Sequence, residues 1–409
     1  MSVTTAVDDG APASPRPQAR RALAGAGCAH ALHDGYADLI YVLLPLWQAE
    51  FGLGYGALAA LRGLFSGAMA VLQVPAGRLA EHLGGRTVLV AGTVLSALGF
   101  ALAGLSGGLV GLCVALALAG AGSSTQHPLA SAAVSRAYGG AARGPLGTYN
   151  FTGDLGKAAL PALTSLLLVW MSWREALWLL ALVGLLTAVL VRALIPAFGG
   201  SGAAAAGADT RAARPAETAA AGRGSNRGAF ALLLGIGVLA GGVRTGFLVF
   251  LPFLLGAKGA DVPLIGLALT LVFLGGAAGK FAFGWLGARL GVLATVVATE
   301  IGTAVMILAV LALPLAPSLV VLPLLGVMLN GTSSVLYGTV PELAPPDRVE
   351  RAFALFYTGT IGSSALSPVL YGTIGDLAGA AWGMAAAAGA ALLTCPLALL
   401  LAPRLRTES

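Results

Sequence analysis

Long apolar runs separated by short polar breaks make up most of this chain. Each run is about 20 residues or longer, the length that a helix needs to cross the hydrocarbon core of a bilayer. The pattern therefore predicts twelve membrane-spanning helices. Their approximate limits are 23–48, 56–80, 87–107, 109–136, 146–170, 173–195, 229–257, 262–287, 291–313, 317–342, 351–377 and 380–402.

One longer polar break divides the twelve spans into two sets of six. It is rich in alanine and glycine, contains several arginines and predicts a disordered linker. We expect an N-terminal tail at 1–22, a six-helix bundle at 23–195, the linker at 196–228, a second six-helix bundle at 229–402 and a C-terminal tail at 403–409. The predicted class is thus an all-α polytopic membrane protein of two pseudo-symmetric bundles.

The two halves repeat a loop motif at a fixed offset. Gly77 and Gly84 enclose a loop that returns between Gly284 and Gly291, and Pro45 falls on Pro252 at the same offset. Parallel repeats of membrane helices are how many secondary transporters are built, with the substrate site between the repeats. The repeat therefore favours a transporter that rocks two halves about a central cavity.

Composition excludes a soluble protein. Hydrophobic residues are 57% of the chain and charged residues 10%, whereas a soluble domain carries about 25% charge. The net charge of +6 does not indicate nucleic acid here, because the basic residues flank apolar runs. The three cysteines, Cys28, Cys113 and Cys395, show no metal-ligand spacing, so we expect neither a disulfide framework nor a metal.

The basic residues also predict the orientation. Most of the 23 lie in the tails, the linker and the even-numbered loops, whereas only Arg174 and Lys258 lie in odd-numbered loops. Positive loops stay on the cytoplasmic side. We therefore expect a multi-pass protein of the inner (plasma) membrane with both termini and the linker in the cytoplasm.

Eight charged residues lie inside the predicted spans, where each costs about 2.5–3.5 kcal/mol at a helix centre if it faces lipid. They must face protein or a water-filled cavity, and we expect them to pair. They are Asp34, Asp38, Arg62, Asp154, Lys157, Arg244, Lys280 and Glu300.

The first span carries the sharpest pattern. His30, Asp34 and Asp38 are spaced four residues apart, so they share one helical face, and Tyr41 follows. A buried carboxylate beside an imidazole can carry a proton, and Asp34 lies near the middle of the span. The alternative is a structural ion pair with a cation on another helix. His33 points away, and we expect it to pack.

The other buried charges allow two interpretations. Asp154 and Lys157 are spaced for a local ion pair or for substrate contact, and Arg244 stands alone and could receive an anion. We expect structural roles for Arg62, Lys280 and Glu300.

Polar residues on the fourth span, around Pro128, complete the candidate site. They bring hydroxyls, an amide and an imidazole into an apolar helix, although ordinary interhelical hydrogen bonding is the alternative. We expect proton coupling at Asp34, Asp38, His30 and His127. The predicted substrate contacts are Arg244, Lys157, Asp154, Gln126, Ser123, Tyr41, Asn330, Tyr337 and Tyr357.

The repeated loop resembles the signature loop of the major facilitator superfamily, Gly-x-Leu-x-Asp-Arg-x-Gly-Arg-Arg. Glu81 stands where the acid usually is, and Arg86 matches a terminal basic position. The second copy keeps Arg289 but has Ala288 at the acid position. The resemblance implies a conformational latch at Gly77, Glu81, Gly84, Arg86, Gly284, Arg289 and Gly291.

Within that superfamily the chain resembles the fosmidomycin-resistance branch of exporters. The similar segments are His30 to Asp34, Pro45 to Leu53, Gly120 to Pro128 and Pro341 to Pro345. His33 and Leu129 depart from the branch, which has asparagine and an acid there. The resemblance implies the transporter fold and proton antiport, and it does not extend to fosmidomycin itself.

These observations predict proton-coupled efflux of a small organic or anionic compound or drug by alternating access. The alternative is a proton symporter that imports an organic anion such as a carboxylate. A channel or a membrane enzyme is disfavoured, because the chain has no ring of like residues and no nucleophile with a base and an acid. We expect no cofactor beyond the proton gradient, and a monomer whose partners are substrate, protons and lipid.

Overall fold

The computed structural model describes residues 17–199, 227–344 and 349–406. Throughout these ranges the regular structure is helical and contains no strand, which confirms the predicted all-α class. In chain order the elements are α1 (Pro17–Phe51), α2 (Tyr55–Leu83), α3 (Gly85–Ala103), α4 (Leu109–Ser123), α5 (Gln126–Tyr138), the 3₁₀ turn η1 (Gly139–Ala141), α6 (Arg143–Leu167), α7 (Trp173–Leu194), α8 (Arg227–Ala257), α9 (Val262–Ala312), α10 (Leu315–Leu343), α11 (Val349–Ala378) and α12 (Ala380–Arg406).

Each predicted span falls on a helical segment. The fourth span is divided between α4 and α5, and α9 contains the eighth and ninth spans on either side of Gly291. Among the described residues, nine segments are long and apolar enough to cross a membrane. α1 and α6 are not among the nine, and they carry the buried acids Asp34, Asp38 and Asp154.

In both halves the repeated loop contains a glycine with a positive φ at the point where a helix ends. Gly84 ends α2 with a φ of 87°, and Gly291 interrupts α9 with a φ of 78°. Both values lie in the left-handed region that glycine adopts without a steric penalty. The glycines of the motif are therefore required where one membrane helix stops and the next begins.

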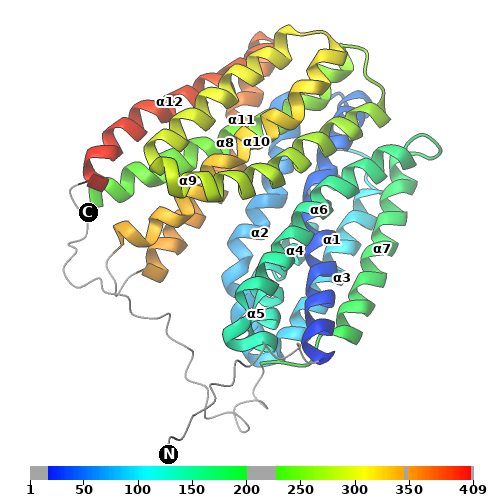
Figure 1. Cartoon of the computed structure of the whole chain (residues 1–409). Coiled ribbons are helices and arrows are strands. Elements are labelled where there is room, and N and C mark those ends of the chain that lie inside the picture. The colour runs from blue at the N-terminus through cyan, green and yellow to red at the C-terminus, as the bar shows by residue number, and fades with distance from the viewer. Residues whose placement is uncertain (1–16, 200–226, 345–348, 407–409) are drawn as a thin grey trace, which may run out of the picture.

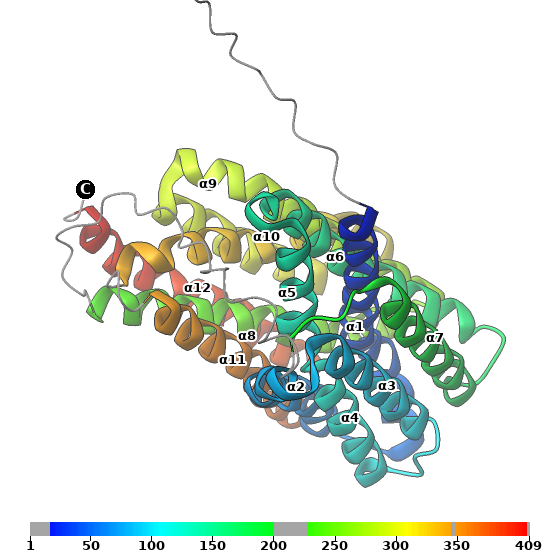
Figure 2. The same ribbon diagram turned by 90° about the horizontal axis from the view of Figure 1, so that it is seen from below.

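The helices form two groups, α1 to α7 and α8 to α12 (Figures 1 and 2). α1 packs on α6 and α3 on α4 in the first group, and α9 packs on α10 and α8 on α12 in the second. Contacts between the groups are made mainly by α2 with α11 and by α6 with α9. The limits of the predicted domains stay a prediction, and residues 1–16, 200–226 and 407–409 of the tails and linker lie outside the described residues.

The two groups meet at the end where α2 begins and α11 ends. Asp376 of α11 accepts hydrogen bonds from the backbone N–H of Tyr55 at 2.6 Å and of Gly56 at 2.9 Å. α2 needs this acceptor, because its own N-cap, Gly54, supplies no side-chain oxygen. A β-carbon on Gly372 would lie 2.8 Å from Gly56 Cα, so the close approach of the two backbones requires glycine.

The groups diverge toward the opposite end, where α1 begins and α12 ends (Figure 1). A β-carbon on Gly77 or Gly284 would meet no atom within 4 Å. Among the described residues, the latch charges Glu81, Arg86 and Arg289 form no ion pair between the groups. The latch loops are therefore apart in this conformation.

Polar contacts hold the end of α1 to the start of α7. Glu50 accepts hydrogen bonds from Arg174 and from the Trp173 indole, each at 2.6 Å. These two hydrogen bonds hold the pKa of Glu50 below its usual range. Ser172 and Glu175 form a capping box, which fixes where α7 begins.

Candidate functional site

The predicted face of α1 is buried where α1 packs on α5 and α6. His30, Asp34 and Asp38 are each 5–7% exposed. Gly153 and Gly156 of α6 allow this packing, since a β-carbon on Gly153 would lie 2.8 Å from Asp34 Oδ2. Three polar groups in a row therefore lie between helices of the first half.

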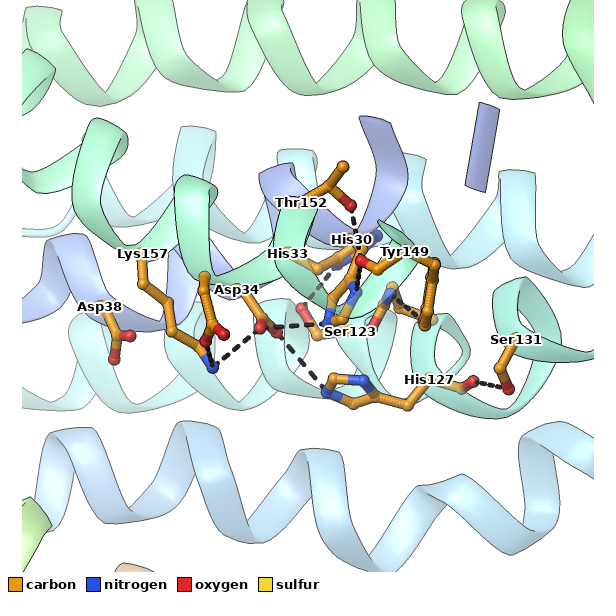
Figure 3. Close-up of polar contacts among 12 residues, drawn as sticks. His30, His33, Asp34, Asp38, Ser123, His127, Ser131, Tyr149, Thr152 and Lys157 are labelled. Atoms are coloured by element: carbon orange, nitrogen blue, oxygen red, sulfur yellow. Dashed lines mark hydrogen bonds and ion pairs between the residues drawn. The ribbon is translucent and has the colours of Figure 1, made fainter. Parts of the chain in front are cut away.

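Asp34 is the hub of the site (Figure 3). Its Oδ2 lies 3.2 Å from His30 Nε2 and 3.0 Å from Lys157 Nζ, and its Oδ1 lies 3.6 Å from His127 Nε2. The predicted proton-coupling residues His30 and His127 thus converge on Asp34 with the predicted substrate residue Lys157. The side chains of His127 and Lys157 are 40% and 28% exposed, so the hub is reached from one side.

The hydrogen bonds of His30 define how many protons it shares with Asp34. His30 Nδ1 lies 2.8 Å from the carbonyl oxygen of Tyr149, which can only accept, so Nδ1 carries a hydrogen. The contact of Nε2 with Asp34 is attractive only if a further proton lies between them. The pair then consists of an imidazolium with a carboxylate, or of a neutral imidazole with a carboxylic acid.

A chain of charges leads from Asp34 to the second half. Lys157 Nζ lies 3.6 Å from Asp154 Oδ1, and Lys280 of α9 lies 2.5 Å from the same oxygen. Asp154 is therefore shared by one ammonium group from each half. Lys280, expected to be structural, forms the one ion pair between the halves in the described parts of the chain.

Asp38 belongs to a separate pair. Its Oδ1 lies 3.4 Å from the guanidinium of Arg62 on α2, which also donates to Ser66. Arg62 lies over the ring of Tyr41 at 5.1 Å from the centroid. Asp38 and Tyr41, both predicted for the site, are thus joined through Arg62 and lie apart from the Asp34 hub.

His33 is held in a closed network, as its expected packing role requires. Its Nε2 lies 3.1 Å from Thr93 Oγ1, and its Nδ1 lies 3.0 Å from Ser123 Oγ. Thr93 donates to the carbonyl of Leu89, so its oxygen accepts from Nε2–H, and the Ser123 hydroxyl, the partner of Nδ1, also contacts Ser96 Oγ at 3.0 Å. Ser123, which is 1% exposed, is therefore occupied by protein partners in this conformation.

Tyr149 is a site residue that sequence reasoning missed. Its carbonyl orients His30, its ring stacks on the His30 imidazole at 4.2 Å, and its hydroxyl accepts from Gln126 at 2.8 Å. A backbone carbonyl carries no signal in the sequence. The one available signal was a tyrosine in the polar fifth span.

The second half contributes fewer charges. Arg244 of α8 donates to Asn330 of α10 at 3.5 Å and forms no ion pair with any carboxylate of the described residues. The rings of Tyr337 and Tyr357 lie 5.0 Å apart. These four predicted substrate contacts form two pairs, and within the described chain none of them touches the Asp34 hub.

The hub also has the donor atoms of a cation site. The ligand atoms of His30, Asp34 and His127 lie within 4.8 Å of one another. The Lys157 ammonium already stands 3.0 Å from Asp34 and supplies a positive charge. The expectation of no metal stays a prediction.

This arrangement, two helical groups with a buried charged hub and a charge bridge between them, defines a membrane transporter class. The sequence model of the Major Facilitator Superfamily matches residues 26–231 and 233–409. The chain therefore belongs to the Major Facilitator Superfamily. No curated protein sequence gives a significant match.

Solved structures share the fold over nearly the whole chain. A bacterial homologue of the human lysosomal transporter Spinster, inward-facing and unoccupied, is 13% identical with a TM-score of 0.78, covering 97% of this chain and 99% of that one. The peptide transporter POT in complex with sulfate is 15% identical with a TM-score of 0.74, covering 95% of each chain. A mutant of the nucleoside transporter NupG is 12% identical with a TM-score of 0.73, covering 95% of this chain and 99% of that one. At these identities the likeness concerns the fold.

Proposed function

We propose that this protein is a proton-coupled antiporter that exports a small organic or anionic compound across the inner membrane by alternating access. The observation that carries the proposal is the Asp34 hub. A buried carboxylate shares a proton with His30, contacts a second imidazole, and is joined through Lys157 and Asp154 to Lys280 of the other half. A change of protonation at Asp34 would therefore be felt at the contact between the halves.

The coupling follows from competition for charge. The substrate binds at Lys157, and the ionised Asp34 beside Lys157 accepts a hydrogen bond from the substrate. When Asp34 gains a proton, the substrate loses that acceptor and is released, so proton and substrate exclude each other. Arg244, whose side chain is paired with the Asn330 amide rather than with a described carboxylate, would supply the second cationic contact for the substrate.

The proposed orientation has both termini in the cytoplasm, as the distribution of basic residues predicts. The closed end at Asp376 would then face outward and the open latch end inward. The inward-facing Spinster homologue has the same fold. The proposed cycle closes the latch end and opens the Asp376 end.

A symporter for an organic anion is the second candidate. Arg244, which is paired with a neutral amide, would serve it equally, because an imported carboxylate needs the same cation. The direction of flux under an imposed pH gradient distinguishes the two. A symporter moves substrate with the proton, and an antiporter moves it against the proton.

Reconstitution in liposomes tests the coupling. A thermal-shift screen of organic anions, phosphonates and drugs at two pH values supplies a transported probe. We expect Asp34→Asn to keep exchange of that probe without a gradient and to lose gradient-driven accumulation by at least about fivefold, the lower end of typical coupling. Glu342→Gln, an exposed acid of α10, is the matched control. Unchanged gradient-driven flux in Asp34→Asn would contradict the assignment of Asp34 as the proton-coupling residue.

A further inference from the structure

Glu300 is a buried acid that the Asp34 mechanism does not use. It lies on the part of α9 after Gly291 and is 3% exposed. Among the described residues it forms no ion pair. A carboxylate removed from water without a counter-ion is strongly disfavoured, so its surroundings favour the neutral acid.

The hydrogen-bond contacts around Glu300 form a chain between α9 and α10, which divides at Thr299, whose Oγ1 also lies 3.1 Å from the carbonyl oxygen of Val296. Glu300 Oε1 lies 2.7 Å from Thr332 Oγ1, and Thr332 Oγ1 lies 2.6 Å from Thr299 Oγ1. Thr299 Oγ1 in turn lies 2.8 Å from the carbonyl oxygen of Thr295. The distances along the chain from Glu300 to Thr295 are those of ordinary O–H···O hydrogen bonds.

A proton on Glu300 lets this chain run in one direction. Each threonine hydroxyl has one hydrogen, and the backbone carbonyls can only accept. If Glu300 is a carboxylic acid, it donates to Thr332, Thr332 to Thr299, and Thr299 to the carbonyl oxygens of its own turn. If Glu300 is a carboxylate, Thr332 donates to it instead, and the buried charge has no counter-ion among the described residues.

The charged groups on neighbouring elements do not offer another partner. On α9 itself, Lys280 pairs with Asp154, and Arg289 lies over the Trp285 ring. α10 presents the Thr332 hydroxyl and α12 carries the Cys395 thiol, neither of which is a cation. No described cation is placed to hold Glu300 in its ionised form.

We propose that Glu300 is a second proton-binding site, which holds a proton while it is buried between α9 and α10. This site is independent of the proposed coupling at Asp34, because it lies in the other half and shares no residue with the hub. When Glu300 loses its proton, Thr332 can still donate to it, but the carboxylate is then a buried charge without a described counter-ion.

Infrared spectroscopy of the full-length protein in lipid tests the protonation state. The difference spectrum between wild type and Glu300→Gln at neutral pH should contain the carbonyl band of a carboxylic acid and lack the matching carboxylate bands. Carboxylate bands alone in this difference would overturn the proposal. If Glu300→Gln does not fold, Glu300→Asp serves instead, because the shortened acid shifts the same band.

Thermal unfolding over a range of pH tests whether the bound proton contributes to stability. The folded protein keeps a proton that the unfolded chain releases, so the Tm of wild type should fall as the pH rises. Glu300→Gln keeps a donor to Thr332 without a titratable group, so its Tm should fall less steeply. Glu342→Gln, the exposed acid on α10, should keep the wild-type slope. Equal slopes in wild type and Glu300→Gln would overturn the proton-binding site, and neither measurement depends on transport.

Discussion

His33 and His30 lie three residues apart on α1 and are held in opposite ways. Both ring nitrogens of His33 are used by buried hydroxyls of neighbouring helices, so the ring is fixed in place. His30 is fixed by one backbone carbonyl and has its other nitrogen directed at Asp34. The same residue type is therefore structural in one place and suited to carry a proton in the other.

Replacing His33 should lower stability without changing coupling. His33→Ala leaves the hydroxyls of Thr93 and Ser123 without their partner in a buried site, so we expect a loss of about 1–3 kcal/mol. Thermal unfolding in detergent measures it, with the exposed His82→Ala as the control. A wild-type Tm in His33→Ala, or lost coupling at wild-type stability, would contradict this assignment.

The sequence predicts which residues matter in the site better than it predicts their partners. The i, i+4 spacing of His30 and Asp34 was sufficient to place them on one face, because a helix has a fixed geometry. The convergence of His127 and Lys157 on Asp34 depends on how α5 and α6 pack, which one sequence does not state. Tyr149 acts through its backbone carbonyl, which every residue possesses.

At the scale of elements, the helix breaks follow glycine and proline. The apolar pattern predicts the end of the eighth span close to Gly291, where α9 changes direction. The break between α4 and α5 falls at Ser124 and Thr125, three residues before Pro128. A proline in the first turn of α5 costs no backbone hydrogen bond, because those N–H groups lack intrahelical acceptors.

Asp376 and Asp261 both accept hydrogen bonds from the first turn of a helix, and of these two only Asp376 joins the halves. Asp376 accepts from Tyr55 and Gly56 across the halves, whereas Asp261 accepts from Leu264 within its own half. Losing a charged cap costs about 1 kcal/mol. We expect Asp376→Ala to shift the population toward opening at this end by about fivefold.

Distances between spin labels measure this shift. Val110→Cys at the start of α4 and Ala257→Cys at the end of α8 place exposed labels on the two halves near the closed end. The background lacks the three native cysteines. Asp261→Ala is the matched control and should leave the distance distribution unchanged. If both substitutions shift it equally, the Asp376 contact has no special role between the halves.

At the scale of the whole molecule, Asp154 and Lys280 form an ion pair between the halves. Asp154→Asn leaves Lys280 without its partner, and Lys280→Gln leaves Asp154 with Lys157 alone, so each substitution should cost about 1–2 kcal/mol of stability. This is below the value for a fully buried pair, because the Lys280 side chain is 36% exposed. The double substitution should cost less than the sum of the two.

A double-mutant cycle on thermal stability and on gradient-driven flux checks this pair. We expect a positive interaction energy in stability and a loss of flux in all three variants. The exposed pair Glu50 and Arg174, which lies within the first half, provides the control cycle. Strict additivity at Asp154 and Lys280 would show that the pair is not coupled.

The two-bundle architecture could be predicted from the repeat, whereas the open end could not. A duplicated set of apolar spans specifies the frame, because each half must bury the same kind of helix faces. The conformation depends on the end of the molecule at which the two bundles contact each other. The same sequence must hold both states with similar free energies if it is to alternate between them.

The contact between Asp376 and α2 joins main-chain donors to a side-chain acceptor, and mutation affects the two differently. Its donors are main-chain N–H groups at Tyr55 and Gly56, which every amino acid except proline supplies. Side-chain variation at Tyr55, proline aside, therefore leaves its donor in place, although a β-carbon on Gly56 would lie 3.1 Å from Asp376 Oδ2. A single codon change at Asp376 can remove the acceptor. The robustness of this closure to mutation rests on one half of the molecule, and its vulnerability rests on the other.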